Sequence, residues 1–292
     1  MSGTLDVSAA GLVVGATDPD AVIAFLGAFG LAEVARHAVD ADTASGLYGL
    51  DRATTEVELG TDGTDHSRVW VVDCDEPGNA PADFERRPRA FDIYTSSMDD
   101  ALEHLRFTGL AHGPVGTLAV GPVTMRQCLV TGPDGLAVVL VESTHRRGSL
   151  LDADDGRLFS EGHSVVWSVD SMDDEAALLS GVGLTKGMDL AFTEPEVSTY
   201  LDLPRSPVPI RMTMLSGEAV DPLRLELLEF SEDPGESVAS DHLAGGLWAL
   251  RYRVADPSAV AESLAHAGCS VEAAGAAMAA TTPGGIRIQL SA

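Results

Sequence analysis

The sequence predicts an α+β protein built from four βαβββ modules, and three observations predict it. A helical segment of one pattern recurs four times, an alternating strand precedes each copy, and short strands separated by Gly, Pro and Asp turns follow it. The chain has 292 residues, of which 45% are hydrophobic, so it can bury a large core and form about two domains.

The recurring segment passes through Ser or Asp with Met or Pro and enters a short helix rich in Ala and Leu. It reads ATDPDAVIAFLGAFGL at 16–31, TSSMDDALEHLRFTGL at 95–110, VDSMDDEAALLSGVGL at 169–184 and VADPSAVAESLAHAGC at 254–269. Three copies end in Gly-Leu and the fourth ends in Gly-Cys. Repetition at a period of roughly 75–85 residues indicates one structural unit that is used four times.

The strand before the helix has an apolar and a polar face, most clearly in modules two and four. In AFDIYT, Phe91 and Ile93 share one face, whereas Asp92 and Tyr94 share the other. The segment ALRYRV before the fourth helix alternates in the same way. We expect the apolar face to pack on the following helix, so the other face should look into a polar space.

The strands after each helix complete the module. Module two gives VTMRQCLV, the turn TGPDG and LAVVLVE, and modules three and four show the same order. We therefore predict two domains of two consecutive modules each. Residues 1–147 form the N-terminal domain, residues 160–292 form the C-terminal domain, and the polar residues 148–159 link them.

Charge and cysteine content restrict the partners. Lys and Arg total 18 against 45 Asp and Glu, which gives a net charge of −27. Such a surface repels phosphate backbones and anionic lipid, so we expect a small-molecule ligand and no nucleic acid or membrane partner. Cys74, Cys128 and Cys269 lie far apart and form no CxxC, which predicts free, mostly buried thiols and fits a reducing cytoplasm. We expect a monomer or homodimer.

The repeated units resemble the vicinal oxygen chelate superfamily, which contains glyoxalase I, the bleomycin-resistance proteins, methylmalonyl-CoA epimerase and the type I extradiol dioxygenases. The resemblance rests on the repeated units, in which a corner with Ser or Asp leads into a helix that ends in Gly-Leu, and on closing strands such as TGPDGLAVVLVE and LRLELLEF. It covers nearly the whole chain. It implies that two modules cup their sheets around a pocket. It also implies a divalent metal ion, which neutralises an enolate-like charge and is held by the first and last strands of each module.

Alignment with this superfamily leaves most of the implied metal ligands missing. The first-strand position falls on Gly11, Ala90, Ser164 and Ala249, and the last-strand position on Val139, Glu226 and Gln289. Apolar side chains do not coordinate a metal ion, so we expect none in the N-terminal domain. A divalent metal ion elsewhere stays open as a cofactor, with His163 and Glu226 as candidate ligands.

His163 lies one residue before the first-strand position of module three. A slip of one residue turns a strand side chain to the other face, so a pocket-facing His163 should bring Val165 and Trp167 with it. The alternative is a structural histidine at the strand edge. His242, in the loop before module four, is a possible substitute ligand or a solvated loop histidine.

The polar candidates concentrate in the C-terminal half, so we place the working site between modules three and four. Strand parity in LRLELLEF puts Glu226 on the cavity face, where we expect it to act as catalytic base. Nearby guanidiniums should hold it ionised. The expected substrate-binding residues are Arg251, Arg253, Gln289, Arg211, Ser164 and Ser168.

Other interpretations of this site stay open. The Arg and Glu side chains could form an internal network with no ligand, and a purely structural Glu226 would shift the search to Asp92 and Tyr94. For function, one hypothesis is an enzyme of lyase, isomerase or dioxygenase type that acts on a small oxygenated organic molecule. The other is a metal-free binder that sequesters a drug or metabolite, similar to the bleomycin-resistance proteins.

Overall fold

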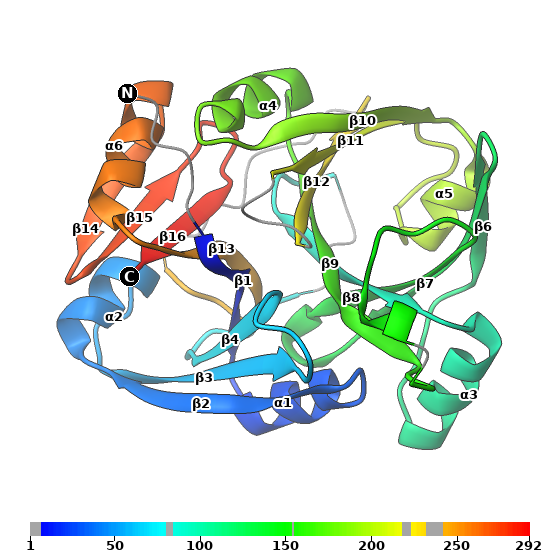
Figure 1. The fold of residues 1–292 in the computed structure, drawn as a ribbon, viewed down its shortest axis with the longest axis horizontal. Helices are drawn as coiled ribbons and strands as arrows, with labels where there is room; N and C mark the ends of the chain where they lie inside the picture. The colour runs from blue at the N-terminus through cyan, green and yellow to red at the C-terminus, as the bar shows by residue number, and fades with distance from the viewer. Residues whose placement is uncertain (1–6, 80–83, 154, 218–222, 232–241) are drawn as a thin grey trace.

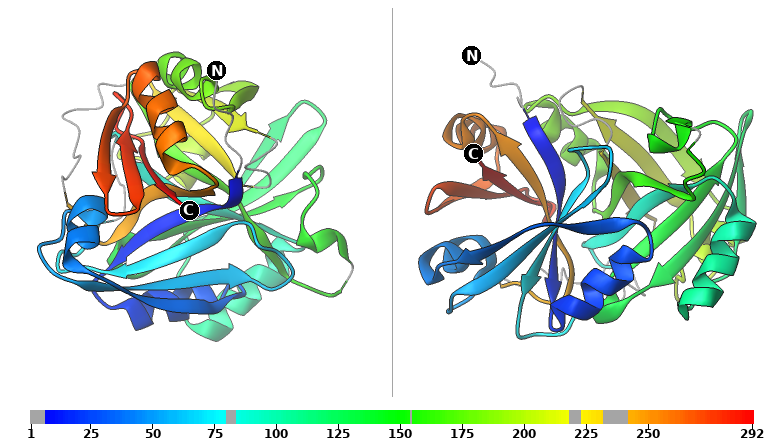
Figure 2. Two further views of the ribbon diagram at one scale, coloured as in Figure 1. Left: turned by 60° about the vertical axis from the view of Figure 1, so that its left-hand side comes forward. Right: turned by 60° about the horizontal axis from the view of Figure 1, so that its bottom comes forward.

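The computed structural model describes the chain except for residues 1–6, 80–83, 154, 218–222 and 232–241. The described residues form two curled eight-stranded sheets that lie side by side (Figure 1). Each sheet is built from two of the four modules. The helix that follows the first strand of each module lies on the outer side of its sheet (Figure 2), whereas the helices of residues 41–48 and 195–200 pack against the concave sides. The α+β class and the four βαβββ modules are therefore confirmed.

The first sheet has the order β14-β15-β16-β13-β1-β4-β3-β2. Its strands are β1 (Val7–Ala16), β2 (Leu31–Val39), β3 (Thr54–Thr61), β4 (Arg68–Asp73), β13 (Gly246–Val254), β14 (Ser270–Ala274), β15 (Ala277–Thr281) and β16 (Arg287–Ser291). The second sheet has the order β10-β11-β12-β9-β5-β8-β7-β6. Its strands are β5 (Pro88–Thr95), β6 (Gly116–Val120), β7 (Val123–Thr131), β8 (Ala137–Ser143), β9 (Phe159–Ser168), β10 (Thr185–Phe192), β11 (Ile210–Ser216) and β12 (Arg224–Phe230).

The four predicted helices form where the repeat places them. They are α1 (Pro19–Gly27), α3 (Met98–Thr108), α4 (Met172–Ser180) and α6 (Pro257–Ala267). The Ser or Asp of each corner, at positions 18, 97, 171 and 256, accepts a hydrogen bond from the backbone N–H three residues later. The recurring corner is therefore a helix N-cap. The remaining helices are α2 (Ala41–Tyr48), α5 (Pro195–Tyr200) and the short 3₁₀ turns η1 (Pro133–Gly135) and η2 (Leu150–Ala153).

The modules pair differently from the prediction. Strand β1 of module one pairs antiparallel with β13 of module four, and β5 of module two pairs antiparallel with β9 of module three. The division into residues 1–147 and 160–292 is therefore wrong, and residues 148–159 connect two modules of the same sheet. Each module offers the edge of its first strand for pairing, and the repeat pattern alone does not say which edge meets which.

The largest hydrophobic core lies on the helix-facing sides of the two sheets and is continuous between them. It includes the alternating residues Phe91 and Ile93 of β5 and Leu225 and Leu227 of β12, as strand parity predicts. Two smaller clusters lie on the concave faces of the sheets. Each concave face is therefore the place where polar residues and cavities are found.

The cysteines follow the prediction of free thiols, since Cys74, Cys128 and Cys269 are all buried and unbridged. Burial raises the pKa of Cys128 and Cys269 to about 11, so both thiols stay protonated near neutral pH. None of the helices that the structure describes is long and apolar enough to cross a membrane.

Candidate functional site

The concave face of the second sheet encloses a cavity of about 460 Å³. Most of its wall is apolar, with a large share of methionine: Leu118, Met125, Met188, Leu190, Phe192, Ile210, Met212 and Met214. The central strands β5, β9 and β12 contribute the polar residues Asp92, Tyr94, His163, Arg224 and Glu226. Other parts of the chain add Gln127, Ser143, His145, Arg146, Arg147 and Tyr200 to the lining. A cavity with an apolar wall and a few converging polar groups is typical of a small-molecule site.

Strand parity places the two carboxylic acids of the cavity as predicted. Asp92 lies between Phe91 and Ile93, which face the core, and it therefore projects from β5 into the cavity. Glu226 projects from β12 in the same way, between Leu225 and Leu227. Asp92 and Glu226, which the predicted domains place in different halves of the chain, therefore meet in one cavity.

A β-bulge brings both His163 and Ser164 to this site. Asp92 of β5 is opposite Ser164, but the next residue, Ile93, is opposite Gly162, so His163 is an extra residue in β9. The Ser164 hydroxyl donates to Asp92 Oδ2 at 2.8 Å, while His163 lines the cavity. His163 faces the cavity without its alternate neighbours, because the bulge restores the phase of the strand and leaves Val165 and Trp167 in the core.

The histidine is held neutral by its surroundings. Burial and the guanidinium of Arg224 keep the pKa of His163 well below its ordinary value. Arg224 Nη2 donates to His163 Nδ1 at 3.0 Å and to the Tyr94 hydroxyl at 3.1 Å, and the Tyr94 ring stacks on the imidazole at 3.7 Å between centroids. With Nδ1 as acceptor, the proton of the neutral ring lies on Nε2, which has no hydrogen-bond partner among the described residues.

The two carboxyl groups are poised near neutral pH. Burial raises the pKa of Asp92 to about 7, although the Ser164 hydrogen bond and Arg224 oppose the shift. Burial and the charge of Asp92 together raise the pKa of Glu226 to about 8, against the lowering effect of Arg224. The two groups are coupled, so the charge of the carboxyl that ionises first raises the pKa of the other. The sequence analysis expected nearby arginines to hold Glu226 ionised. In the structure, burial and the charge of Asp92 raise its pKa instead.

Comparison with known proteins places this arrangement on a known fold. No family model and no curated protein sequence matches the chain. Glyoxalase I from Zea mays matches with a TM-score of 0.64 and 16% sequence identity, over 98% of this chain and 92% of that chain. A putative dioxygenase from Bacillus subtilis subsp. subtilis str. 168 matches with a TM-score of 0.62 and 13% identity, over 99% and 86%.

The chain has the glyoxalase fold. The predicted resemblance to vicinal oxygen chelate proteins is thereby confirmed for the fold. Identities of 13–16% carry the architecture and not the activity, so the function of this glyoxalase-fold protein has to be argued from its own cavity.

The metal ion that the resemblance implies does not fit the residues of this cavity. Among the residues that the structure describes, no three His, Cys, Asp or Glu side chains are grouped so that they could hold a metal ion. Nδ1 of His163 already faces a guanidinium, which repels a cation. The candidate pair of His163 and Glu226 therefore does not make a metal centre. His242 pairs with Glu76 at 2.9 Å and does not line the cavity.

Three of the predicted substrate-binding residues lie on the concave face of the first sheet. Arg251 Nη1 contacts Glu56 Oε2 at 2.6 Å, and Arg251 Nε donates to Gln289 Oε1 at 3.0 Å. Arg253 Nη2 contacts Glu58 Oε2 at 2.8 Å. Strand parity correctly predicts that these side chains face inward. The modules pair differently from the prediction, however, so the side chains lie on the first sheet and not beside Glu226. They form the internal Arg–Glu network that the sequence analysis left open.

The remaining candidates have other surroundings. Ser164 belongs to the cavity, whereas the Ser168 hydroxyl bonds backbone groups of Glu85 and Arg87. Arg211 is on the outer face of β11, where it pairs with Glu229 and Asp173 at 3.1 Å each. Met212 and Met214 line the cavity in place of Arg211, so the predicted phase of β11 was wrong by one residue.

Arg224 is the functional residue that the sequence analysis missed. It lies two positions before Glu226 on β12 and therefore shares its face, so the parity that found Glu226 would also have found Arg224.

We predict that Arg251→Met destabilises the protein by about 3–5 kcal/mol, because it leaves the buried carboxylate of Glu56 without its partner. Urea unfolding followed by circular dichroism measures this change. Adding Glu56→Gln to the variant should recover part of the loss. Arg36→Met, which removes an exposed pair with Glu33, is the control and should leave the unfolding curve unchanged. An equally small effect at Arg251 would contradict the buried network.

We also predict that the free energy of unfolding falls as the pH rises from about 5 to about 9. Carboxyls in the unfolded chain lose their protons near pH ~4, whereas Asp92 and Glu226 keep theirs to about 7 and 8 in the folded state. The folded state therefore binds more protons in this range, and a higher pH favours unfolding. The double variant Asp92→Asn, Glu226→Gln should flatten this dependence. An identical slope in the variant would disprove the assignment.

Proposed function

We propose that this protein is an enzyme that moves a proton on a small oxygenated organic molecule bound in the cavity of the second sheet. The observation that carries the proposal is the pair of Asp92 and Glu226, two carboxyls that share one mostly apolar cavity and titrate near neutral pH. Proton transfer by a side chain is most efficient when its pKa lies near the working pH. Two such groups with slightly different values can serve as base and acid in one reaction.

The hydrogen bonds of the pair suggest the roles. Ionised Asp92, held by the Ser164 hydroxyl on Oδ2, is the base that takes a proton from a carbon next to a carbonyl group. Its Oδ1 has no hydrogen-bond partner among the described residues and is the atom that would receive this proton. Glu226, still protonated, is the acid that returns a proton to the substrate. The reaction is therefore of isomerase or lyase type.

Arg224 supplies the charge that this reaction requires. Removing a proton next to a carbonyl leaves negative charge on the carbonyl oxygen, and a fixed positive group in a cavity of low polarity stabilises it. Arg224 lines the cavity, opposes the raised pKa of both carboxyls, and is held by the Tyr94 hydroxyl and by His163. His163 positions the guanidinium, and its Nε2–H is a further donor for a substrate oxygen. The dioxygenase type needs a redox metal, which these residues do not fit.

A metal-free binder is the alternative, and the wall of the cavity favours it. Four of the lining residues, Met125, Met188, Met212 and Met214, are methionines, whose flexible side chains adapt to ligands of different shape. A protein that only sequesters a ligand would need no titrating pair. The same cavity supports both functions, so turnover has to be measured.

The test is the exchange of carbon-bound protons for deuterium. Small aldehydes and ketones are incubated with the protein in D₂O, and loss of the α-proton signal is followed by NMR. We expect Asp92→Asn to slow exchange by about 10²-fold or more and Glu226→Gln to slow it less, because a second group can reprotonate the product. Glu142→Gln on the outer face of β8 is the matched control, since Glu142 pairs with Arg126 and does not line the cavity.

The pH dependence of this exchange should be bell-shaped. Activity should rise as the first carboxyl of the pair ionises near pH 7 and fall as the second ionises near pH 8. In Asp92→Asn the acidic limb should be lost. A ligand that is retained in native mass spectrometry but never exchanges, in wild type and variants alike, would replace the enzyme by the binder.

A further inference from the structure

Tyr200, the last residue of α5, lies where three hollows of the second sheet meet. It lines the cavity of about 460 Å³ that contains Asp92 and Glu226. It also lines a groove of about 510 Å³ between α5 and the start of β6, and a small pocket of about 30 Å³. Among the described lining residues, Tyr200 is the one that all three share. Its side chain is therefore the partition between the cavity and the groove.

The fold holds the base of this side chain against the edge strand. A Cβ atom placed on Gly116 of β6 would lie 3.1 Å from the Cβ of Tyr200, so only glycine leaves full room for the helix to approach this closely. The helix is anchored a turn earlier, where the Val208 backbone N–H donates to the Ser198 hydroxyl at 2.9 Å. Ser198 and Val208 are both buried. The position of Tyr200 is therefore fixed by its neighbours on two sides.

The other end of the side chain reaches toward the polar residues of the cavity. Burial raises the pKa of Tyr200 well above its ordinary value, and the charges of Asp92 and Glu226 add to this shift. The hydroxyl is therefore close enough to both carboxyls to feel their charge. The Cβ, in contrast, lies against β6, which is the edge strand of the sheet. The ring thus spans the space between the edge strand and the central strands β5 and β12.

The wall of the cavity beside Tyr200 is apolar. Leu118 of β6 lines it there, together with Val197 and Leu201 from α5 and its end. The ring of Tyr200 packs on the cluster of the concave face to which Val197 belongs. Apolar groups gain free energy when they leave water for such a wall, whereas polar groups without a partner lose it. When the carbonyl group of a ligand lies at the carboxyls, the part that meets Tyr200 is therefore an alkyl or aryl substituent.

We propose that Tyr200 determines specificity by limiting the length of the apolar substituent that the cavity accepts. Its ring closes the cavity toward the groove between α5 and β6, so a short substituent fits and a longer one meets the ring. The substrate class is therefore an aldehyde or ketone with a short apolar tail. This inference rests on the proposed function for the carbonyl group of the ligand, but it requires only binding and no turnover.

The test is the affinity of the full chain for straight-chain methyl ketones, from 2-butanone to 2-undecanone, measured by isothermal titration calorimetry. In wild type, each added methylene should tighten binding about fourfold until the tail reaches Tyr200, and the affinity should then stop rising. In Tyr200→Ala the cavity joins the groove, so ketones beyond this break should bind about tenfold more tightly than they bind wild type. Tyr200→Leu, which keeps more of the packing, should move the break in the same direction. Circular dichroism confirms that each variant is folded.

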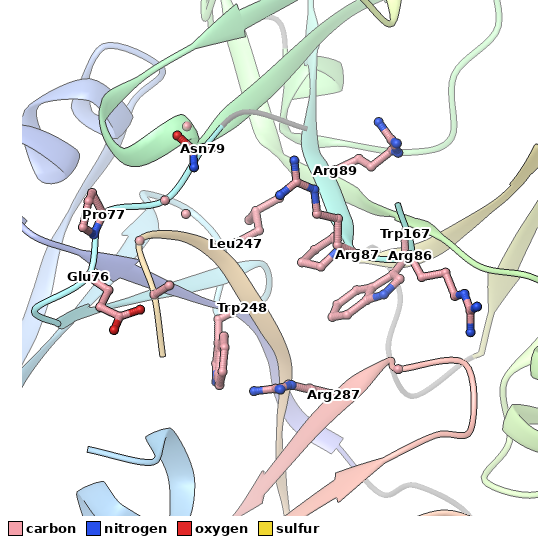
Figure 3. Close-up of a pocket in the computed structure, with 17 residues that line it drawn as sticks. Glu76, Pro77, Asn79, Arg86, Arg87, Arg89, Trp167, Leu247, Trp248 and Arg287 are labelled. Atoms are coloured by element: carbon pink, nitrogen blue, oxygen red, sulfur yellow. The ribbon is translucent and has the colours of Figure 1, made fainter. Parts of the chain in front are cut away.

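Two controls accompany these variants. Tyr200→Phe keeps the ring, so the break should stay at the wild-type length. Trp248→Ala is the matched truncation of an aromatic residue and should leave every affinity unchanged. Figure 3 shows Trp248 beside Arg287 in the pocket between the two sheets, which shares no described lining residue with the cavity.

The outcomes separate this inference from the proposed function. If no ketone binds, if wild type shows no break, or if the break stays in place in Tyr200→Ala, the role of Tyr200 is refuted. Binding with the expected break but without deuterium exchange would refute the proposed function alone.

Discussion

The antiparallel pairing between first strands of different modules is the constraint on which the rest of the structure depends. Strand β1 joins β13, and β5 joins β9, so each sheet becomes a continuous curved surface of two modules. Because side chains alternate across a strand, these pairings decide which polar residues share a concave face. They bring Asp92 of module two to Glu226 of module three, and they bring Arg251 of module four to Glu56 of module one.

The two concave faces contain the same kinds of side chain, arginines and carboxylic acids, but differ in how these side chains are paired. In the first sheet, Arg251 reaches across to Glu56, Gln289 and the hydroxyl of Tyr48, and the side chains satisfy one another. In the second sheet, Arg224 bonds Tyr94 and His163 instead, and neither carboxyl forms an ion pair with another residue that the structure describes. One face is therefore a filled network of paired side chains, while the other is a cavity whose two acid groups have no ion pair among the described residues.

The raised pKa values of Asp92 and Glu226 follow from this arrangement. A carboxylate beside an arginine is ordinarily ionised, but burial in a cavity walled by Met, Leu, Ile and Phe outweighs the charge of Arg224. Such a site stores protons near neutral pH at some cost in stability, as functional sites often do.

The sequence by itself determined the elements and the faces of most strands. Repetition gave four modules, the capped corners gave the helices, and period-two alternation put Asp92, Glu226 and Arg251 on concave faces. These are local properties, set by hydrogen bonding and side-chain direction within a few residues. The predicted phase failed at β11, where Arg211 faces outward.

Only the tertiary structure decided which modules join. Four similar first strands present equivalent edges, and the choice among them depends on how whole faces pack, which no single segment encodes. The bulge at His163 belongs to the same level, because it is defined by the register of β9 against β5. For this reason the predicted site combined Glu226 with Arg251 and Arg253, which the structure places on the other sheet.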